Sequence, residues 1–381
     1  MRELKSMKLG IDISQIVYAG SGVARFTNGL LNTILDLDRK NSWFFFFSSL
    51  RRTLDPGLEK KIKDCGHRLL KWKLPPTALS FLFNDLHNFS KLLTSNIKHL
   101  TSLDWLITSD WTEPPLPVNK ATVVHDLVYL RYPELVDKKI LLTQQKRLNW
   151  VKKESRIIFA DSNATKQDLI EILKINKKKI VVNYPGVEIK KPTEKQIRLT
   201  LNKYNLKKPF ILTVGKLEPR KNLNRLIEVF NRVKNHSVIL VIVGPPGWNK
   251  TNTSINRLIE ASSGNVYYLG RIADEELYSL YLSSLFYIQP SIWEGFGYPV
   301  VEAMKLNKPV AAANTSSLKE IVQDAGLLFD PYNLDEIYNC INIMLNNSKL
   351  RADLAKKGYE RSKIFTWNKY FTTMMRVLSN N

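Results

Sequence analysis

Cysteine is nearly absent from this sequence of 381 residues, which contains only Cys65 and Cys340. The two residues are far apart in the chain and show no metal-ligand spacing, so we expect neither a disulfide framework nor a cysteine metal site. So few cysteines are typical of a reducing compartment, and we therefore expect a cytoplasmic protein.

Long hydrophobic runs are missing as well. No stretch reaches the roughly 18 apolar residues that a membrane-spanning helix needs. Residues 1–8 are charged and the apolar run after them is short, so no signal peptide is expected. With 44% hydrophobic and 24% charged residues, the composition is globular, and the length allows two domains.

Acidic residues are few compared with basic ones. The chain has 35 Asp and Glu against 57 Lys and Arg, a formal net charge of +22 that is spread over both halves. A general positive field favours anionic partners such as nucleotide sugars, anionic lipid head groups or nucleic acid, and solubility alone is the alternative explanation. The even spread, without a helix-turn-helix, zinc or base-stacking signature, argues against nucleic acid.

The most informative stretch covers residues 289–310 and has the sequence QPSIWEGFGYPVVEAMKLNKPV. It begins at the end of an apolar run that predicts a strand, and it continues through a loop that contains Gly295 and Gly297. Pro299 stands where a helix over 298–306 would begin. Glycines let backbone N–H groups approach a ligand, and the start of a helix suits an anionic phosphate.

Two carboxylates flank this turn, Glu294 in the loop and Glu302 on the predicted helix. Carboxylates accept hydrogen bonds from sugar or ribose hydroxyls, so the whole string suits a nucleotide sugar. The alternative is an ordinary strand-to-helix turn with two solvated glutamates.

At these residues the string EGFGYPVVEAM resembles the E-x7-E signature of retaining glycosyltransferases of the GT-B fold, in the large family 4. The resemblance implies an α/β protein with two Rossmann-like domains facing each other across a cleft, and a C-terminal helix that crosses back to the first domain. It also implies that Glu302 holds the ribose hydroxyls of the donor. Glu294 and the N–H groups of Phe296 and Gly297 would face the donor sugar.

A second group of candidate residues follows the predicted strand 209–215. Lys216, Arg220 and Lys221 come directly before a predicted helix over 222–233. Cations at this place can hold a diphosphate and stabilise it as a leaving group, whereas the alternative is a solvated basic loop. The string VGKLEPRKN resembles the phosphate-binding motif of the family, with the departure that many members have arginine at the position of Lys216; lysine keeps the charge but loses the planar fork.

The segment YLGRIADEEL resembles the family segment whose backbone holds the nucleotide base, near Ile272. In the first half, a predicted strand over 8–13 leads through Gly20, Ser21 and Gly22 into a predicted helix. This order is that of a phosphate-binding unit, although glycines alone are weak evidence. In the family this loop lies against the donor diphosphate and the acceptor.

His125 follows the predicted strand 121–126, at the edge where open parallel sheets bind ligands. A lone histidine is usually structural, but this string resembles the His-Asp motif of the family, in which the histidine lies beside the donor sugar. We therefore favour a functional His125, with Asp126 either orienting the ring or capping the next segment.

Two further strings suggest other chemistry. Asp36-Leu37-Asp38 has the D-x-D pattern of a different glycosyltransferase fold, but it lies at the end of a predicted helix, so we interpret it as a solvated helix end and expect no metal. Residues 43–47, WFFFF, suggest a membrane contact, yet a buried strand of a parallel sheet explains them better. Residues 75–103 mix aromatics and lysines, and this region of similar enzymes meets the acceptor or the membrane.

We expect an N-terminal acceptor-binding domain over 1–190, a linker over 191–208, a nucleotide-sugar-binding domain over 209–364 and a crossover helix over 365–381.

The predicted reaction is hexose transfer from a nucleoside diphosphate sugar to a hydroxyl, with retention at the anomeric carbon and without metal or other cofactor. The string GIDISQIVYAGSGVARFT resembles bacterial mannosyltransferases that assemble surface polysaccharides such as O-antigen. This favours GDP-mannose and a lipid-linked or lipopolysaccharide acceptor, with peripheral contact to an anionic membrane at the inner face of the plasma membrane. UDP-hexose donors remain an alternative, and a basic nucleic-acid-binding protein or a non-catalytic scaffold is the alternative outside this class.

Overall fold

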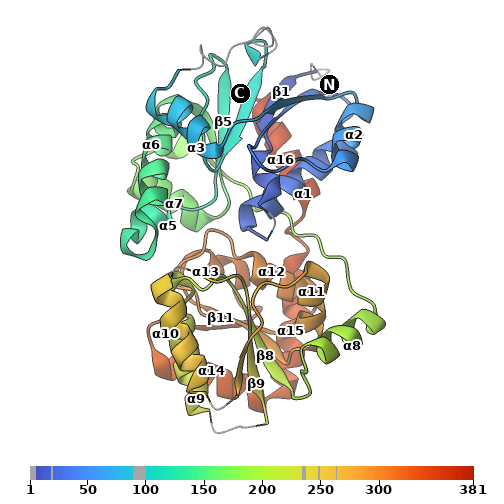
Figure 1. Cartoon of the computed structure of the whole chain (residues 1–381), viewed down its shortest axis with the longest axis vertical. Helices are drawn as coiled ribbons and strands as arrows, with labels where there is room; N and C mark the ends of the chain where they lie inside the picture. Colours follow the sequence, from blue (N-terminus) through green and yellow to red (C-terminus); the bar gives the residue numbers. More distant parts are fainter. Residues whose placement is uncertain (1–5, 19, 89–99, 234–236, 248, 263) are drawn as a thin grey trace. The chain divides into compact units, whose positions relative to one another are not determined.

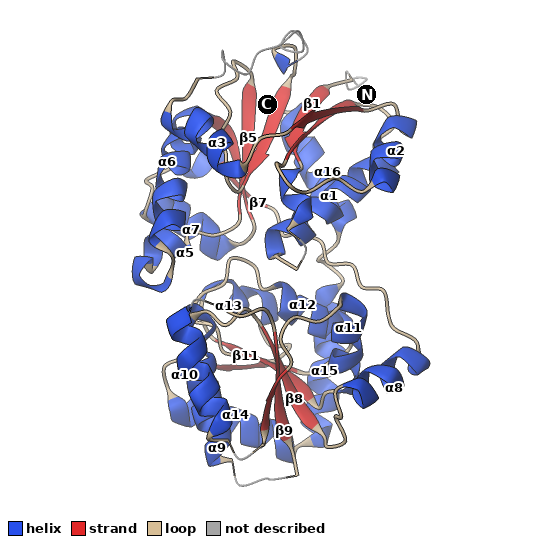
Figure 2. Ribbon diagram, viewed as in Figure 1, coloured by secondary structure: helices blue, strands red, loops and turns tan. Residues whose placement is uncertain are grey.

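The computed structural model describes residues 6–18, 20–88, 100–233, 237–247, 249–262 and 264–381. The chain forms two compact units, Met1–Gly186 with Thr366–Asn381, and Val187–Phe365 (Figure 1). Each unit is a parallel sheet flanked by helices, as Figure 2 shows. No helix among the described residues is long and apolar enough to cross a bilayer.

The first unit is built on a seven-stranded sheet in the order β3-β2-β1-β4-β5-β6-β7, and every pairing is parallel. Its strands are β1 (Lys8–Asp12), β2 (Ser42–Ser48), β3 (Arg68–Trp72), β4 (Trp105–Ser109), β5 (Asn119–Val124), β6 (Ser155–Ala160) and β7 (Ile180–Val182). Its α-helices are α1 (Gly22–Leu37), α2 (Pro56–Asp64), α3 (Pro76–Ser80), α5 (Val128–Arg131), α6 (Lys138–Glu154), α7 (Asn163–Glu171) and α16 (Trp367–Ser379). Short 3-10 or π turns are η1 (Ser14–Val17), η2 (Phe81–Asp85), η4 (Pro133–Leu135) and η5 (Lys177–Lys179).

The aromatic run of β2 is buried on both faces of this sheet, which confirms the predicted strand. Trp43, Phe45 and Phe47 join one core cluster. Phe44 and Phe46 point to the other side and join a second cluster. Successive side chains of a strand alternate between faces, so a run of five aromatics fills both layers of a covered parallel sheet.

Helix α16 comes from the end of the chain but packs beside α1 in the first unit (Figure 1). The contact is close, because a Cβ at Gly29 of α1 would lie 2.0 Å from the Trp367 ring. The rings of Trp367 and Tyr370 meet Phe26 of α1 edge to face, with centroids 5.5 and 5.3 Å away. The predicted return of the C-terminal helix to the first domain is therefore present.

The second unit has a six-stranded parallel sheet in the order β10-β9-β8-β11-β12-β13. Its strands are β8 (Phe210–Val214), β9 (Ile239–Val243), β10 (Val266–Tyr268), β11 (Phe286–Gln289), β12 (Val310–Ala313) and β13 (Leu327–Phe329). Its helices are α8 (Glu194–Lys203), α9 (Leu223–Arg232), α10 (Asn249–Glu260), α11 (Asp274–Ser283), α12 (Tyr298–Lys305), α13 (Ser316–Val322), α14 (Leu334–Asn346) and α15 (Ser348–Ser362), with the 3-10 turn η6 (Pro219–Lys221).

The stretch predicted as a linker, 191–208, contains a helix of the second unit. Helix α8 starts with a complete capping box between Thr193 and Gln196. Tyr204 then donates a hydrogen bond of 3.0 Å to Glu276 of α11. The polar composition that suggested a linker belongs to the solvent side of this helix.

The structure also corrects the interpretation of Asp38 as part of a solvated helix end. Asp38 is only 5% exposed, and its carboxylate accepts hydrogen bonds from Trp43 Nε1 at 2.8 Å and from the side chain of Asn41 at 2.9 Å. Burial alone would raise the pKa of Asp38, but these hydrogen bonds lower it. Asp36 does lie at the surface, where it pairs with Lys61. Within the region 75–103, residues 89–99 lie outside the described residues.

Candidate functional site

Three predicted cations of the second unit lie in the loop after β8, and they pair with carboxylates. Lys216 Nζ lies 3.1 Å from Glu218 Oε1, and Arg220 Nε lies 3.0 Å from Glu218 Oε2. Turn η6 then brings Lys221, which is only 8% exposed, under the loop. Glu218 was not predicted, because a carboxylate between cations has no sequence signature of its own.

The loop after β11 carries the partner of this cluster. Glu294 Oε1 accepts from Lys221 Nζ at 2.5 Å, and Glu294 Oε2 accepts from Arg220 at 3.1 Å. Ser291 Oγ donates to the same carboxylate at 2.7 Å and Gln289 at 3.2 Å. Burial alone would raise the pKa of Glu294, but the charges of Lys221 and Arg220 and the hydrogen bonds from Lys221 and Ser291 lower it to about 2. Glu294 is therefore ionised at neutral pH.

This pairing joins two predicted groups that the sequence treated separately. The prediction gave Glu294 to the donor sugar and Lys221 to the diphosphate, whereas the structure bonds them to each other. Burial lowers the pKa of Lys221, since a buried ammonium loses hydration. Of the predicted cations, Lys216 is the one with a substantially exposed side chain, at 36%.

The turn between β11 and α12 has the geometry that its glycines predict. Gly297 has φ of +99°, a conformation that suits glycine, and it directly precedes the first residue of α12. A Cβ there would lie 2.9 Å from Leu318 of α13. Ser317 Oγ donates to the carbonyls of Glu294 and Phe296 at 2.9 and 3.0 Å, so α13 fixes this loop. The helix start carries partial positive charge beside the cluster.

Glu302 lies inside α12 and is 1% exposed. Tyr281 OH of α11 donates to Glu302 Oε2 at 3.3 Å. The side chain is thus held in place, and its predicted contact with ribose hydroxyls stays a prediction.

The loop after β9 supports the cation loop by close backbone packing. A Cβ at Gly244 would lie 2.0 Å from the carbonyl oxygen of Gly215, and one at Gly247 would lie 1.5 Å from that of Leu217. Gly244 N–H also donates to the carbonyl of Gly270 at 2.9 Å, which links this loop to the segment that carries Ile272. The loops after β8, β9 and β10 therefore form one packed group.

In the first unit, the predicted glycine loop starts α1. Gly20 has φ of +82°, and Ser21 is the N-cap residue, whose Oγ accepts from Ala24 N–H at 3.1 Å and donates to Tyr18 O at 2.9 Å. Gly22 is the first residue of the helix. The local turn is therefore as predicted, and its contact with a phosphate stays a prediction.

His125 follows β5 and is oriented by Asp161, which follows the neighbouring strand β6. Nδ1 of the ring lies 2.7 Å from Asp161 Oδ2. Because a carboxylate accepts, Nδ1 carries a proton, and Nε2 has no hydrogen-bond partner among the described residues. The ring also packs edge to face on Phe26, with centroids 4.7 Å apart. Burial alone would lower the pKa of His125, but the charge and hydrogen bond of Asp161 raise it.

The structure decides between the two roles left open for Asp126. Its Oδ1 accepts from Val128 N–H at 3.2 Å, so Asp126 caps the next segment, and Asp161 orients the ring. Asp161 was not predicted from the sequence. Its only signal was a carboxylate directly after a buried strand, which the sheet order places beside His125.

Further carboxylates lie at the same edge of the first sheet. Asp110 follows β4 with φ of +65°, and burial raises its pKa to about 6 although His125 lowers it. Asp12 ends β1, and burial raises its pKa as well. The carboxyl ends of β1, β4, β5 and β6 therefore present titratable groups at one edge, where open α/β sheets bind ligands.

Known proteins resemble this chain both in sequence and in fold. Residues 196–361 match the family model described as "Glycosyl transferases group 1". The chain is 29% identical to the O-antigen chain mannosyltransferase B of Escherichia coli over 65% of its own length. The alignment spans 66% of that relative, slightly less than two thirds of its length.

Solved structures agree over nearly the whole chain. Sucrose-phosphate synthase from Thermosynechococcus elongatus superposes with a TM-score of 0.75 at 17% identity, and covers 97% of this chain and 98% of its own. HepE of Anabaena, solved in complex with UDP and glucose, has a TM-score of 0.73 at 17% identity, with 98% and 100% covered. These likenesses confirm the predicted α/β fold of the GT-B class.

Proposed function

We propose that this chain, which carries a group 1 glycosyltransferase domain in a GT-B fold, is a retaining hexosyltransferase. It moves a hexose from a nucleoside diphosphate sugar to a hydroxyl of a lipid-linked or surface-polysaccharide acceptor. The observation that carries the proposal is the cation cluster at the carboxyl ends of β8 and β11, where Arg220 and Lys221 pair with the ionised Glu294 and Lys216 pairs with Glu218.

The chemistry of this cluster suits a departing diphosphate. In the proposed step, the bond from the anomeric carbon to the β-phosphate oxygen breaks, and the diphosphate leaves with the bonding electrons. The acceptor hydroxyl oxygen forms the new bond on the same face, and its proton passes to the leaving phosphate oxygen. Lys216 and Lys221 stabilise the charge that develops on the diphosphate. Glu294 and His125 position the sugar and its developing positive charge, and Glu302 holds the ribose.

GDP-mannose is the donor that we propose. The support is the relative from Escherichia coli, which is named as a mannosyltransferase, together with the N-terminal string that resembles such enzymes. A UDP-hexose is the second candidate, because a structural neighbour was solved with UDP and glucose. We propose that neither donor needs a metal, since lysine and arginine side chains can supply the positive charge.

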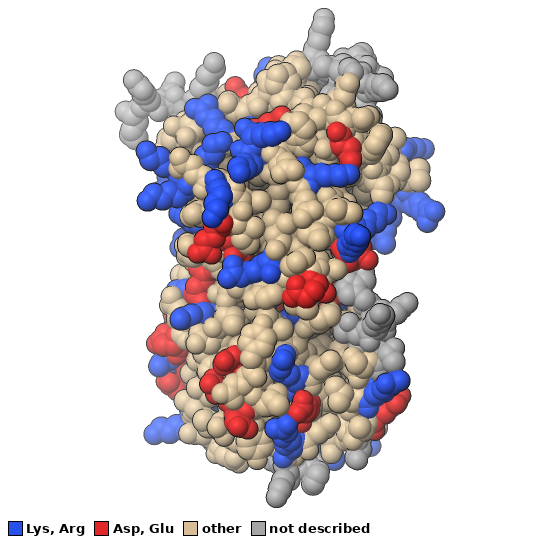
Figure 3. Space-filling view, turned by 90° about the vertical axis from the view of Figure 1, so that its left-hand side faces the viewer, with Lys and Arg blue, Asp and Glu red and all other residues tan. Residues whose placement is uncertain are grey.

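The exposed face of α6 supports peripheral contact with an anionic membrane. Phe81 at the start of η2, Leu86 directly after it, and Leu142 on α6 are 55%, 49% and 47% exposed. Trp150 Nε1 donates to Asn84 O at 2.8 Å, and Lys146 pairs with Asp85, so η2 lies against α6. Lysine and arginine side chains gather on this face of the first unit (Figure 3); those of α6 that are exposed are Lys138, Lys139, Lys146, Lys152 and Lys153.

Apolar side chains among lysines are typical of surfaces that rest in a lipid interface. Sedimentation with vesicles that contain anionic phospholipid, at low salt, tests this contact. The protein is expected to pellet with them and to stay in the supernatant with neutral vesicles. Equal behaviour with both vesicle types would remove this part of the proposal.

A thermal-shift panel tests the donor. The purified protein is heated with GDP, UDP, ADP and their common sugars, first without metal and then with magnesium. Stabilisation by GDP and GDP-mannose in both conditions is the expected result. Stabilisation by a UDP-sugar would keep the enzyme class and refute the mannose donor, and no shift with any nucleotide would favour a non-catalytic scaffold.

Lys216→Met tests the cation cluster without disturbing a buried pair. The side chain is partly exposed, so its removal should leave the fold intact, in contrast to Lys221, which lies buried against Glu294. A hydrogen bond to a charged group contributes about 1.5–3 kcal/mol, so the Kd for the nucleotide should rise at least roughly tenfold. Lys207→Met, at an exposed lysine before β8, is the matched control and should leave the Kd unchanged.

A further inference from the structure

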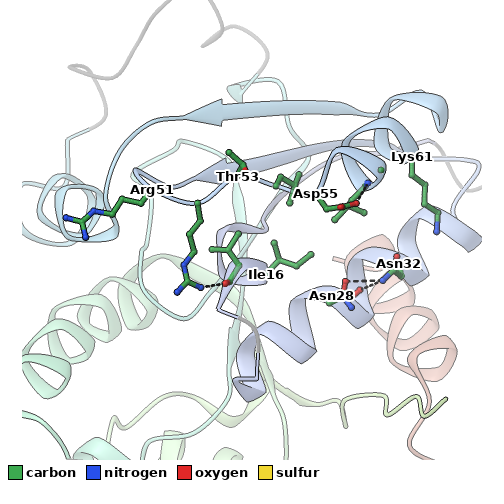
Figure 4. Close-up of a pocket in the computed structure, with 12 residues that line it drawn as sticks. Ile16, Asn28, Asn32, Arg51, Thr53, Asp55 and Lys61 are labelled. Carbon is green, nitrogen blue, oxygen red and sulfur yellow. Dashed lines mark hydrogen bonds between the residues drawn. The ribbon is translucent and has the colours of Figure 1, made fainter. Parts of the chain in front are cut away.

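A hollow of about 800 Å³, whose lining does not include His125, opens in the first unit between α1 and the segment that leads from β2 into α2. Figure 4 shows Asn28 and Asn32 of α1 on one side and Thr53, Asp55 and Lys61 on the other. Ligand pockets usually measure roughly 300–1,000 Å³, so the hollow is large enough for part of a substrate. No predicted site residue lines it.

The position of the hollow in the fold favours a ligand. Ile16 and Val17, on its floor, follow β1, and Arg51 and Arg52 follow β2. The hollow therefore lies at the carboxyl edge of the parallel sheet, where open α/β sheets bind ligands. His125 follows β5 at the same edge.

Positive charge dominates its lining. Arg51 makes no ion pair among the described residues, and Arg52 donates to the carbonyl of Val17 and lies over the Tyr18 ring, so neither arginine is neutralised by a carboxylate. The lining carboxylate, Asp55, already accepts from Leu58 N–H at 2.9 Å as the N-cap of α2. Both arginine charges thus remain available to an anion.

An adjoining hollow of about 450 Å³ lies along α2 and is also lined by cations. It shares Gly57 and Lys61 with the first and adds two cations, Arg39 and Lys60, and one carboxylate, Asp64. Arg39 donates to the carbonyl of Leu35, which is not a charge partner. Among the cations that line the two hollows, Lys61 is the one to which the described residues supply a carboxylate partner, Asp36, and that pair is largely exposed.

The types of side chain that line the hollow favour a phosphate group as the ligand. Arginine binds phosphate oxygens with two parallel N–H groups, and neighbouring lysines add charge. A neutral sugar needs no such excess of cations, and none of the described lining residues has an aromatic ring on which a nucleotide base could stack. Asn28 and Asn32 supply amide groups for hydroxyls beside the phosphate, and Ile16 and Leu54 supply an apolar floor.

We infer that this hollow binds the phosphate or diphosphate group of a phosphorylated acceptor, the group that joins the acceptor glycan to its lipid carrier. The inference rests on the proposed function, because it assigns a place to the acceptor of that reaction. It adds a binding site in which Arg51 and Arg52 hold the anion.

Decyl diphosphate is a suitable probe for this site, measured by isothermal titration calorimetry. The titration is run with the nucleotide selected by the thermal-shift panel at saturating concentration, so that the cation cluster of the second unit is occupied. The variant is the double change Arg51→Gln and Arg52→Gln. The matched control is Arg198→Gln, at an exposed arginine of α8 in the second unit.

The double variant should bind decyl diphosphate at least tenfold more weakly than the wild type, while the Arg198→Gln control binds it as the wild type does. The nucleotide-induced shift of the double variant should equal that of the wild type, and its unfolding midpoint should stay close to the wild-type value, since both arginines are exposed and Arg52 loses only surface contacts with Val17 and Tyr18.

Equal affinity of wild type and double variant for decyl diphosphate, with the nucleotide shift intact, would overturn this inference and leave the proposed function standing. A loss of binding to vesicles of anionic phospholipid, without a loss for decyl diphosphate, would assign the arginines to lipid head groups and would overturn it too. Absence of any nucleotide shift in the wild type would instead refute the proposed function.

Discussion

Acid should destabilise the second unit through Glu294 more than through any exposed carboxylate. Lys221 and Arg220 hold the pKa of Glu294 at about 2, against an ordinary value of 4.5. A carboxyl whose folded-state pKa is lowered stabilises the protein above its unfolded pKa, and this contribution is lost as the pH falls towards the folded value. At 1.36 kcal/mol for each pKa unit, the contribution at neutral pH is about 3 kcal/mol.

Most of this contribution should disappear between pH 4.5 and pH 2. By pH 3 the loss amounts to roughly 2 kcal/mol when both pKa values enter the linkage relation. The assay is urea unfolding followed by circular dichroism at pH 7 and pH 3, for the wild type and for Glu294→Gln. The stability advantage of the wild type over the variant should be about 2 kcal/mol smaller at pH 3 than at pH 7.

Glu228→Gln is the control, because Glu228 forms an exposed pair with Arg232 within α9. Exposed pairs of this kind contribute about 0–1 kcal/mol. The free energy of unfolding of this variant should therefore stay within about 1 kcal/mol of the wild-type value at both pH values. A wild-type advantage over Glu294→Gln that is the same at pH 7 and pH 3 would refute the reasoning, since the carboxyl would then titrate alike in the folded and unfolded chain.

Two other substitutions follow from the geometry of each unit. Asp161→Asn should lower kcat by at least roughly tenfold, with little change in the KM for the donor. The acid limb of the pH profile of kcat should move to lower pH, because the pKa of His125 falls without its carboxylate partner. An unchanged pH profile would mean that His125 has no role in the reaction. Gly297→Ala should lower the free energy of unfolding by roughly 1–3 kcal/mol, because Gly297 has a φ of +99° and an added Cβ would contact Leu318. Gly264 has a φ of +77°, but an added Cβ would meet open space. In the same urea titration, Gly264→Ala should therefore lower the free energy of unfolding by less.

The strands and the turn chemistry of the second unit could be predicted from the sequence because the signals there are local. The loop that ends in Gly297, with Pro299 after it, specifies its own backbone, and the structure follows it. The apolar repeat of α9, at Leu223, Leu226, Ile227 and Phe230, is likewise buried as its spacing predicts.

Helix α6 shows why other elements were missed. Its buried face includes Gln144 and Arg147, so hydrophobic periodicity fails to mark it. Gln144 donates to the carbonyl of Asp110 at 2.7 Å, and Arg147 donates to the carbonyl of Val123 at 3.1 Å. These contacts join residues more than twenty positions apart, and a helix that is buried through hydrogen bonds cannot be recognised from its own residues.

The charged pairs of the two candidate sites also depend on contacts between distant parts of the chain. The pairing of Lys221 with Glu294, and of His125 with Asp161, depends on which strands are neighbours in the sheet, because each pair joins loops that follow adjacent strands. Once the strand order β8-β11 and β5-β6 is known, both pairs follow from the rule that parallel strands present their carboxyl ends at one edge. The sequence alone supplied one member of the second pair.

The proposed acceptor site is harder to predict for a physical reason. The proposed phosphate site of the second unit combines glycines, a helix start and neighbouring cations within short segments, so its sequence is recognisable. The hollow beside α1 uses arginines, asparagines and aliphatic residues of kinds that occur on any surface, contributed by separate segments. Its character depends on which charges stay unpaired: Lys61 has Asp36, whereas Arg51 and Arg52 meet no carboxylate among the described residues. That property exists only in three dimensions, so an acceptor site of this kind can be inferred from the folded chain and tested there by charge removal.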